Sequence, residues 1–242
     1  MSLQGIIFDK DGVLFDFRAT WESWAKSLLM RLCDNDAGRA QIAGQAVGFD
    51  LAQSRFDASS VIIAGTLDEI AQGLSPYVAV QKDLLGVLRD EASVAPQVET
   101  VPLRAFMQDL KARGLRLGVA TNDAIDPATA HLKSANVFEC FDMVAGYDSG
   151  HGAKPEPGQL LAFCAQTGLA PEHCLMVGDS LHDMIAGQRA GMQTLGVLTG
   201  MAPAEILAPH ATAVLPDIGH IPAWLDLQND QSSLRYDKKR RK

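Results

Sequence analysis

The sequence predicts an α/β fold in which a doubly wound parallel sheet forms the core and an all-α cap domain is inserted into it. Four short apolar segments alternate with helical patterns of about ten residues, as in sheets covered by helices on both faces. After the first apolar segment this alternation stops, and residues 17–97 have an almost entirely helical pattern. With 242 residues, 47% of them hydrophobic, the chain has enough apolar material for a buried core.

The expected strands are short apolar runs. Residues 5–8 form the first, and their unbroken apolar character indicates a strand buried on both faces. Similar runs follow at 115–120, 174–177 and 193–197, with a weaker candidate at 141–145. Polar residues follow several of these runs directly. They are therefore expected at the carboxyl edge of the sheet, where open α/β sheets bind their ligands.

Helical patterns separate these strands. Leu103, Phe106, Met107 and Leu110 recur at i, i+3, i+4 and i+7, and Gly114 follows where a helix C-terminus is expected. Further helices are expected over 127–135 with Asp126 as N-cap, over 157–167 ended by Gly168, and over 183–190 ended by Gly191.

The insert is expected to contain helices over 20–32, 37–47, 67–74 and 81–91, the first with an apolar face of Trp21, Trp24, Leu28 and Leu32. The expected domains are thus a core of residues 1–16 and 98–229, a cap of residues 17–97, and a basic, flexible tail of residues 230–242.

Composition disfavours several classes of protein. The formal net charge of -8 disfavours a nucleic-acid partner, and no apolar run approaches the ~18 residues of a membrane span. The four cysteines form no C-x-x-C pair, and the N-terminus does not resemble a signal peptide, so a reducing, cytoplasmic location is expected. A monomer or homodimer is expected.

Carboxylates gather at the expected strand ends. Asp9 and Asp11 follow the first strand and flank one residue, so on an extended backbone they point the same way, while Lys10 between them points away. Asp179 and Asp183 follow another strand. Converging carboxylates repel one another, and an oxygen-only ligand set without clustered His or Cys suits Mg²⁺.

The remaining polar groups suit a phosphoryl group. The Thr121 hydroxyl and the Asn122 amide can donate hydrogen bonds to its oxygens, and Lys154 adds positive charge. Asp9 is then the expected nucleophile toward phosphorus. Asp11 is the expected general acid and base.

This set of motifs resembles the haloacid dehalogenase-like hydrolase superfamily. Residues 9–16 match its first motif, D-x-D-G-[TV]-L-x-D, and Thr121-Asn122 match the second. Lys154, in Lys-Pro-Glu-Pro, matches the third, and Gly178-Asp179-Ser180-x-x-Asp183 matches the fourth. The helical insert lies where this superfamily carries its cap.

The resemblance implies a Rossmann-like core and a two-step phosphatase mechanism. Asp9 is implied to form an aspartyl-phosphate, with Asp11 as acid and base and with Thr121, Asn122 and Lys154 binding the substrate. Asp9, the Asp11 backbone carbonyl and Asp179 are implied Mg²⁺ ligands, with Asp183 supporting the metal.

The sequence is most similar to phosphoglycolate phosphatase-like members, so the expected substrate is a small phosphorylated metabolite. Two alternatives stay open: a sugar phosphomutase of the same superfamily, and a non-catalytic binding scaffold. Phe17, Arg18 and Arg55 are candidate substrate contacts, and His151 is a candidate for the site rim. His182 is expected to face solvent, and Trp21 and Trp24 to lie in the cap core or at the interface between cap and core.

Overall fold

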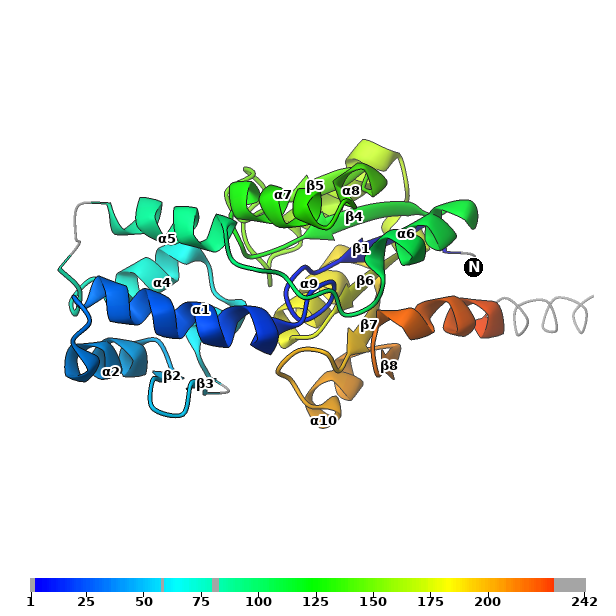
Figure 1. Cartoon of the computed structure of the whole chain (residues 1–242). Coiled ribbons are helices and arrows are strands. Elements are labelled where there is room, and N and C mark those ends of the chain that lie inside the picture. Colours follow the sequence, from blue (N-terminus) through cyan, green and yellow to red (C-terminus); the bar gives the residue numbers. More distant parts are fainter. Residues whose placement is uncertain (1–2, 58, 80–82, 229–242) are drawn as a thin grey trace, which may run out of the picture.

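A six-stranded sheet lies at the centre of the larger lobe in the computed structural model, which describes residues 3–57, 59–79 and 83–228 (Figure 1). Its strands pair in parallel throughout. Their order is β5 (Met143–Ala145), β4 (Arg116–Ala120), β1 (Gly5–Phe8), β6 (Cys174–Gly178), β7 (Gln193–Val197) and β8 (Ala213–Leu215). The α/β fold class is therefore confirmed, and β1 is buried along its whole length as expected.

The two faces of the sheet are covered by different helices. Ile6 and Phe8 point to one face, packed with α6 (Leu103–Ala112), α7 (Ile125–Ser134) and the helical residues 221–228. Ile7 points to the other, packed with α8 (Gly158–Thr167) and α9 (Leu181–Ala190). Because neighbouring residues of a strand face opposite ways, an all-apolar β1 is what burial on both faces requires.

The cap forms the second lobe, with its own apolar core (Figure 1). It contains α1 (Phe17–Leu32), α2 (Ala37–Ala46), α3 (Val61–Ala64), α4 (Leu67–Leu74) and α5 (Leu84–Ser93). It is not all-α, because a short antiparallel pair, β2 (Phe49–Asp50) and β3 (Arg55–Phe56), lies between α2 and α3. The rings of Phe49 and Phe56 meet there at a tilt of 57°, with 4.8 Å between their centroids, and both residues belong to the cap core.

Several boundaries differ from the sequence prediction. Asp126 is not the N-cap of α7, which begins at Ile125; the Ile125 N–H instead donates to the Asp148 carboxylate at 2.9 Å. α9 begins at Leu181, two residues early, because Ser180 and Asp183 form a capping box. The elements β8 and α3 are not among those expected from the sequence, because both are too short to show a periodic pattern of apolar residues.

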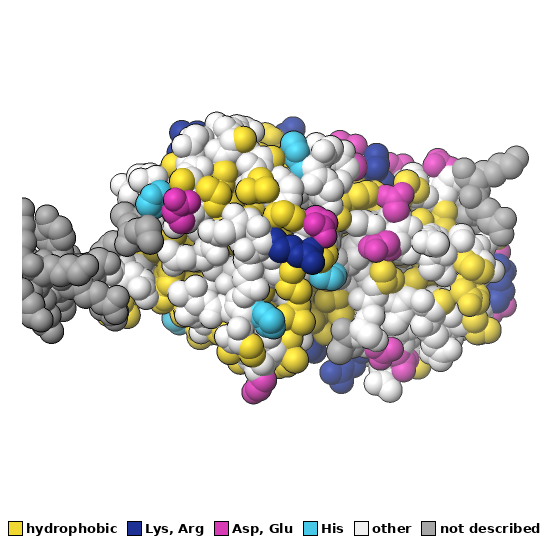
Figure 2. Space-filling view, turned by 180° about the vertical axis from the view of Figure 1, so that it is seen from behind, with side chains coloured by type: hydrophobic (Ala, Val, Ile, Leu, Met, Phe, Trp, Pro, Cys, Tyr) yellow, Lys and Arg dark blue, Asp and Glu magenta, His cyan; other side chains and the backbone are white. Residues whose placement is uncertain are grey.

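The short helix α10 (Ala204–Leu207) and 3₁₀ turns at Phe138–Cys140, Pro171–His173, Ala208–His210 and Ile218–His220 complete the core. The expected tail, residues 230–242, lies outside the described residues. Among the helices of the described chain, none is long and apolar enough to cross a membrane. On the face shown in Figure 2, the Lys and Arg side chains lie among acidic and uncharged ones and form no continuous basic band over the described residues.

Candidate active site

The carboxyl end of β1 delivers Asp9 to the centre of the sheet edge. The Asp9 N–H donates to the Val177 carbonyl at 2.9 Å, which continues the β1–β6 pairing by one residue. The chain then turns at Gly12, whose φ is +78°. A Cβ at this position would lie 2.5 Å from an Asp179 carboxylate oxygen, so only glycine lets the turn pass this close to Asp179.

Three carboxylates meet at this edge. One oxygen from each of Asp9, Asp179 and Asp183 lies within 4.8 Å of the others. Desolvation by burial, reinforced by Asp183, raises the pKa of Asp9 to about 7 in spite of Lys154. Burial, together with the neighbouring carboxylates of Asp183 and Asp9, raises the pKa of Asp179 well above its ordinary value. The site therefore carries more negative charge than its own cation balances.

Lys154 is that cation. Its Nζ lies 2.7 Å from Asp9 Oδ1 and 2.7 Å from Asp183 Oδ1, and the residue is 4% exposed. Although burial alone would lower the pKa of Lys154, the two carboxylates raise it, so the ammonium stays charged. Asp183 is also tied down by its other oxygen, which accepts from the Ser180 N–H at 3.0 Å and its hydroxyl at 2.7 Å.

The carboxylate group fits a hard divalent cation. All three residues offer oxygen ligands, and the raised pKa values of Asp9 and Asp179 indicate that Lys154 alone does not balance the negative charge of the group. The backbone at residues 12 and 200 passes directly against Asp179. Both residues are glycines, and a Cβ on either would collide with the Asp179 carboxylate. Asp9, Asp179 and Asp183 could hold Mg²⁺ here, whereas the Asp11 side chain lies outside this group.

Thr121 and Asn122 follow β4 and have different surroundings. The Thr121 hydroxyl oxygen accepts from the Asp123 N–H at 3.1 Å, which leaves its proton to donate to a ligand. The Asn122 amide is already engaged: its nitrogen donates to the carbonyls of Ala64 and Lys154 at 2.8 and 2.9 Å, and its oxygen accepts from the Lys154 N–H at 2.8 Å. Asn122 therefore orders the Lys154 loop and touches the cap.

The Asp11 carboxylate faces the cap. Its Oδ1 accepts from the Trp21 indole N–H at 2.8 Å, and its Oδ2 lies 2.6 Å from Lys10 Nζ. Burial alone would raise the pKa of Asp11, but Lys10 and the indole lower it below its ordinary value, so Asp11 is ionised in this arrangement. Asp9 and Asp11 both line the pocket and both contact Lys10, whose backbone N–H donates to Asp9 Oδ1 at 2.7 Å while its ammonium contacts Asp11.

Lys10 is a site residue that the sequence analysis missed. Its side chain is fully buried, with Nζ 3.3 Å from an Asp123 carboxylate oxygen and 3.0 Å from His131 Nδ1, besides its contact with Asp11. The expectation that it points away is wrong because the strand ends at Phe8, and the alternation of a strand does not extend to residue 10. The signal available was a lysine directly between two acidic residues.

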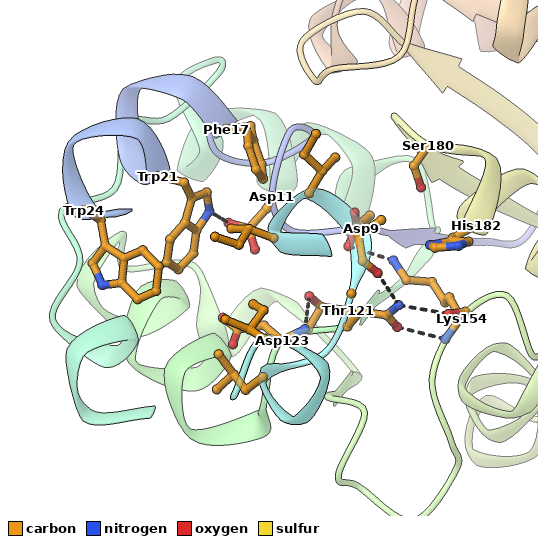
Figure 3. A pocket seen from close by; sticks show the side chains of 17 residues that line it. Asp9, Asp11, Phe17, Trp21, Trp24, Thr121, Asp123, Lys154, Ser180 and His182 are labelled. Carbon is orange, nitrogen blue, oxygen red and sulfur yellow. Dashed lines mark hydrogen bonds and ion pairs between the residues drawn. The ribbon is translucent and has the colours of Figure 1, made fainter. Parts of the chain in front are cut away.

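Five of these residues, Asp9, Asp11, Thr121, Asn122 and Lys154, line one pocket of about 600 Å³ of empty space, part of it open to solvent (Figure 3). Asp179, Asp183 and Lys10 lie behind this lining. The residues of the core domain form the polar floor of the pocket. They are Asp9, Asp11, Thr121, Asn122, Asp123, Lys154, Ser180 and His182. Its roof, the part from the cap, has no polar side-chain group beyond two indole N–H groups. It consists of Phe17, Trp21, Trp24, Ile62, Ile63, Ala64, Gly65, Leu67 and Ile70.

The other candidates divide clearly. Phe17 lines the roof as a possible substrate contact, and His182, expected in solvent, instead lines the floor. Arg18, Arg55 and His151 are exposed and do not line the pocket. Trp21 and Trp24 are buried in the cap core as expected, and their rings meet edge to face at 4.9 Å.

The chain is similar to known hydrolases in sequence. The family model for haloacid dehalogenase-like hydrolases matches residues 3–191. Pyrophosphatase PpaX of Bacillus pumilus is 27% identical over 209 residues, 86% of this chain and 89% of that protein. PpaX of Bacillus cereus is 37% identical over 106 residues, and a phosphoglycolate phosphatase of Psychrobacter arcticus is 37% identical over 94 residues. Those two alignments span 49% and 41% of the relatives' own lengths and 43% and 39% of this chain.

Solved structures share the fold over nearly the whole chain. A predicted phosphoglycolate phosphatase from Haemophilus somnus 129PT superposes with a TM-score of 0.70 at 20% identity, covering 92% of this chain and 98% of that one. A hydrolase from Deinococcus radiodurans R1, solved with bound phosphate and sodium, gives 0.64 at 19% identity, covering 92% and 95%. At these identities the likeness concerns the fold, including the helical insertion.

Proposed function

Because the chain belongs to the haloacid dehalogenase-like hydrolase family, we propose that it is a Mg²⁺-dependent hydrolase of phosphomonoesters of a small metabolite, acting through an aspartyl-phosphate on Asp9. The observation that carries the proposal is the environment of Asp9. One of its oxygens lies 2.7 Å from the Lys154 ammonium. Asp9 belongs to the group of three carboxylates, and it lines the pocket floor together with Asp11.

In the first step an Asp9 oxygen attacks phosphorus, and the bond from phosphorus to the ester oxygen breaks. Asp11 in its protonated form gives its proton to the departing alkoxide. In the second step Asp11, now ionised, takes a proton from water, whose oxygen attacks phosphorus and releases phosphate from Asp9. The ionised Asp11 described above corresponds to the state at the start of this second step.

The remaining floor residues bind and position. Thr121 donates its hydroxyl proton to a phosphoryl oxygen, and Lys154 holds Asp9 and Asp183 in place. Asn122 acts through the Lys154 loop, since its amide is engaged with backbone groups. Asp9, Asp179 and Asp183 would hold a Mg²⁺ ion, which would neutralise part of the phosphoryl charge.

The proposal is tested by phosphate release from p-nitrophenyl phosphate with Mg²⁺, compared between wild type and Asp9→Asn. We expect turnover in the wild type, none in excess EDTA, and a loss of more than about 10³-fold in Asp9→Asn with unchanged circular dichroism. A hydroxylamine-labile ³²P label should form on the wild type only. Undiminished turnover by Asp9→Asn contradicts the nucleophile, and isomerisation of a sugar phosphate without net phosphate release points to a mutase.

A further inference from the structure

The pocket is divided sharply between its two domains. Every polar side chain that would meet the phosphoryl group belongs to the floor, and the roof presents aromatic and aliphatic surface (Figure 3). With the phosphoryl group on the floor beside Asp9, the ester oxygen points to the roof. The roof is therefore the surface that recognises the alcohol part of the substrate.

We propose that this alcohol is uncharged and largely apolar, so that the substrate is an aryl or alkyl phosphomonoester in place of phosphoglycolate or pyrophosphate. The inference rests on the proposed phosphomonoester hydrolysis and specifies its substrate class. It departs from the activities that the names of the relatives carry, since both of those substrates place a negative charge where this chain places the roof.

The composition of the roof is the first argument. Phe17, Trp21 and Trp24 come from α1, and Ile62, Ile63 and Leu67 from α3 and α4. Trp21 contributes its ring only, because its indole N–H is donated to Asp11 at 2.8 Å. Each methylene group that a ligand buries against such a surface favours its turnover by about 10- to 200-fold.

The pairing of the nearby cations is the second argument. Lys154 Nζ lies 2.7 Å from two carboxylates, and Lys10 Nζ is buried among Asp11, Asp123 and His131. Arg18 and Arg55 are exposed and outside the pocket. His182 lies on the floor beside Lys154, away from the tryptophans (Figure 3). A carboxylate or phosphate on the alcohol side would therefore lose its hydrating water, while the one lysine among the described pocket residues is already paired with two carboxylates, and such desolvation is costly.

The geometry of the aromatic rings is the third argument. The rings of Trp21 and Trp24 both line the pocket and stand perpendicular to each other, with 4.9 Å between their centroids. Such rings offer both faces and edges, which suits edge-to-face contact with an aromatic alcohol.

The test compares kcat/KM for four substrates at saturating Mg²⁺: benzyl phosphate, n-butyl phosphate, 2-phosphoglycolate and inorganic pyrophosphate. We expect benzyl phosphate to exceed 2-phosphoglycolate by at least about tenfold, with n-butyl phosphate between them. Ile62→Arg, which adds a cation to the roof, should narrow or reverse this ratio. The matched control Ile42→Arg, at a residue of α2 that is 55% exposed and outside the pocket, should leave it unchanged.

The outcomes separate the two proposals. An active enzyme that prefers 2-phosphoglycolate overturns the inference and leaves phosphomonoester hydrolysis standing. A preference for pyrophosphate, which is an anhydride, over all three esters overturns the inference and contradicts the proposed function as well. A ratio that Ile62→Arg and Ile42→Arg shift equally overturns the role of the roof. A folded protein that hydrolyses none of the four with Mg²⁺ contradicts the proposed function itself, and the inference falls with it.

Discussion

Lys10 Nζ lies 2.6 Å from Asp11 Oδ2, and the whole lysine side chain is excluded from solvent. The same ammonium contacts Asp123 and the ring nitrogen of His131. Lys10 thus joins the proposed acid and base to the first residues after β4 and to helix α7. A buried ammonium with these partners fixes both the position and the charge of the Asp11 carboxylate.

Replacing this lysine tests that relationship. In Lys10→Met, Asp11 loses the neighbour that keeps its pKa below the ordinary value. The acidic limb of the kcat–pH profile should move to higher pH, because Asp11 must be ionised to activate water, and kcat should fall by about 10²-fold or more. Lys10→Arg, which keeps the charge, should restore part of the profile. An acidic limb that does not move would show that Lys10 acts through packing alone.

The Trp21 indole N–H gives a second test, with Trp24 as its matched control. Trp21→Phe leaves one Asp11 oxygen without its donor and should reduce the free energy of unfolding by about 1–3 kcal/mol. In Trp24 the indole N–H is buried and meets no acceptor among the described residues, so Trp24→Phe removes an unsatisfied group and should cost less. Denaturant unfolding of both variants measures the difference, and equal losses would assign the effect to ring size.

Lys154→Met should destabilise the protein, because it leaves the negative charge of the carboxylate group without its cation. Asp9 and Asp183 would lose the cation that each now holds at 2.7 Å, and we expect a loss of about 3–5 kcal/mol without metal. Mg²⁺ should then raise Tm by more than it does in wild type, since it replaces part of the missing charge. The exposed Lys111→Met is the control, with a change within about 0.5 kcal/mol. Equal Mg²⁺ shifts in wild type and Lys154→Met would contradict a metal at the carboxylate group.

His131 should make stability depend on pH. Its pKa is lowered to about 4, by burial first and by Lys10 second, against an ordinary value of 6.5. Between these values the unfolded chain binds more protons than the folded one, so this contribution to stability is present above pH 6.5 and is lost as pH falls toward 4.

The His131→Gln variant lacks this titrating group, so lowering the pH from 7.5 to 5 does not cost it this part of its stability. The difference in free energy of unfolding between wild type and variant should therefore fall by about 2 kcal/mol over this range. Asp123, whose pKa burial raises to about 6, contributes with the opposite sign in both proteins and cancels from the comparison. Denaturant unfolding at the two pH values measures this, and a difference that does not change with pH contradicts the prediction.

The polar residues that meet at the edge of the sheet could be anticipated from the sequence because they follow strands. Asp9, Thr121 and Asp179 come directly after apolar runs, and parallel strands bring their carboxyl ends to one edge. Lys10 was misjudged because the chain turns after Phe8, with Leu14 N–H donating to the Lys10 carbonyl, and strand alternation no longer applies.

The roof could not be predicted for a different reason. The helix α3 consists of Val61, Ile62, Ile63 and Ala64, an apolar run too short to show helical or strand periodicity. Which residues of the cap face the core depends on how the two domains pack, and no local pattern records that. Arg18 and Arg55 were plausible contacts by residue type, yet both lie on the outside.

The hydrogen bond from the Asn122 amide to the Ala64 carbonyl joins the two parts of the pocket at 2.8 Å. Its acceptor is main chain, so it places no demand on which side chains α3 carries. Substitutions at 62 and 63 could therefore accumulate over generations without loosening this attachment. The proposed preference for an alcohol could thus change through the side chains of α3, while the attachment of α3 to the phosphate-binding side of the pocket stays the same.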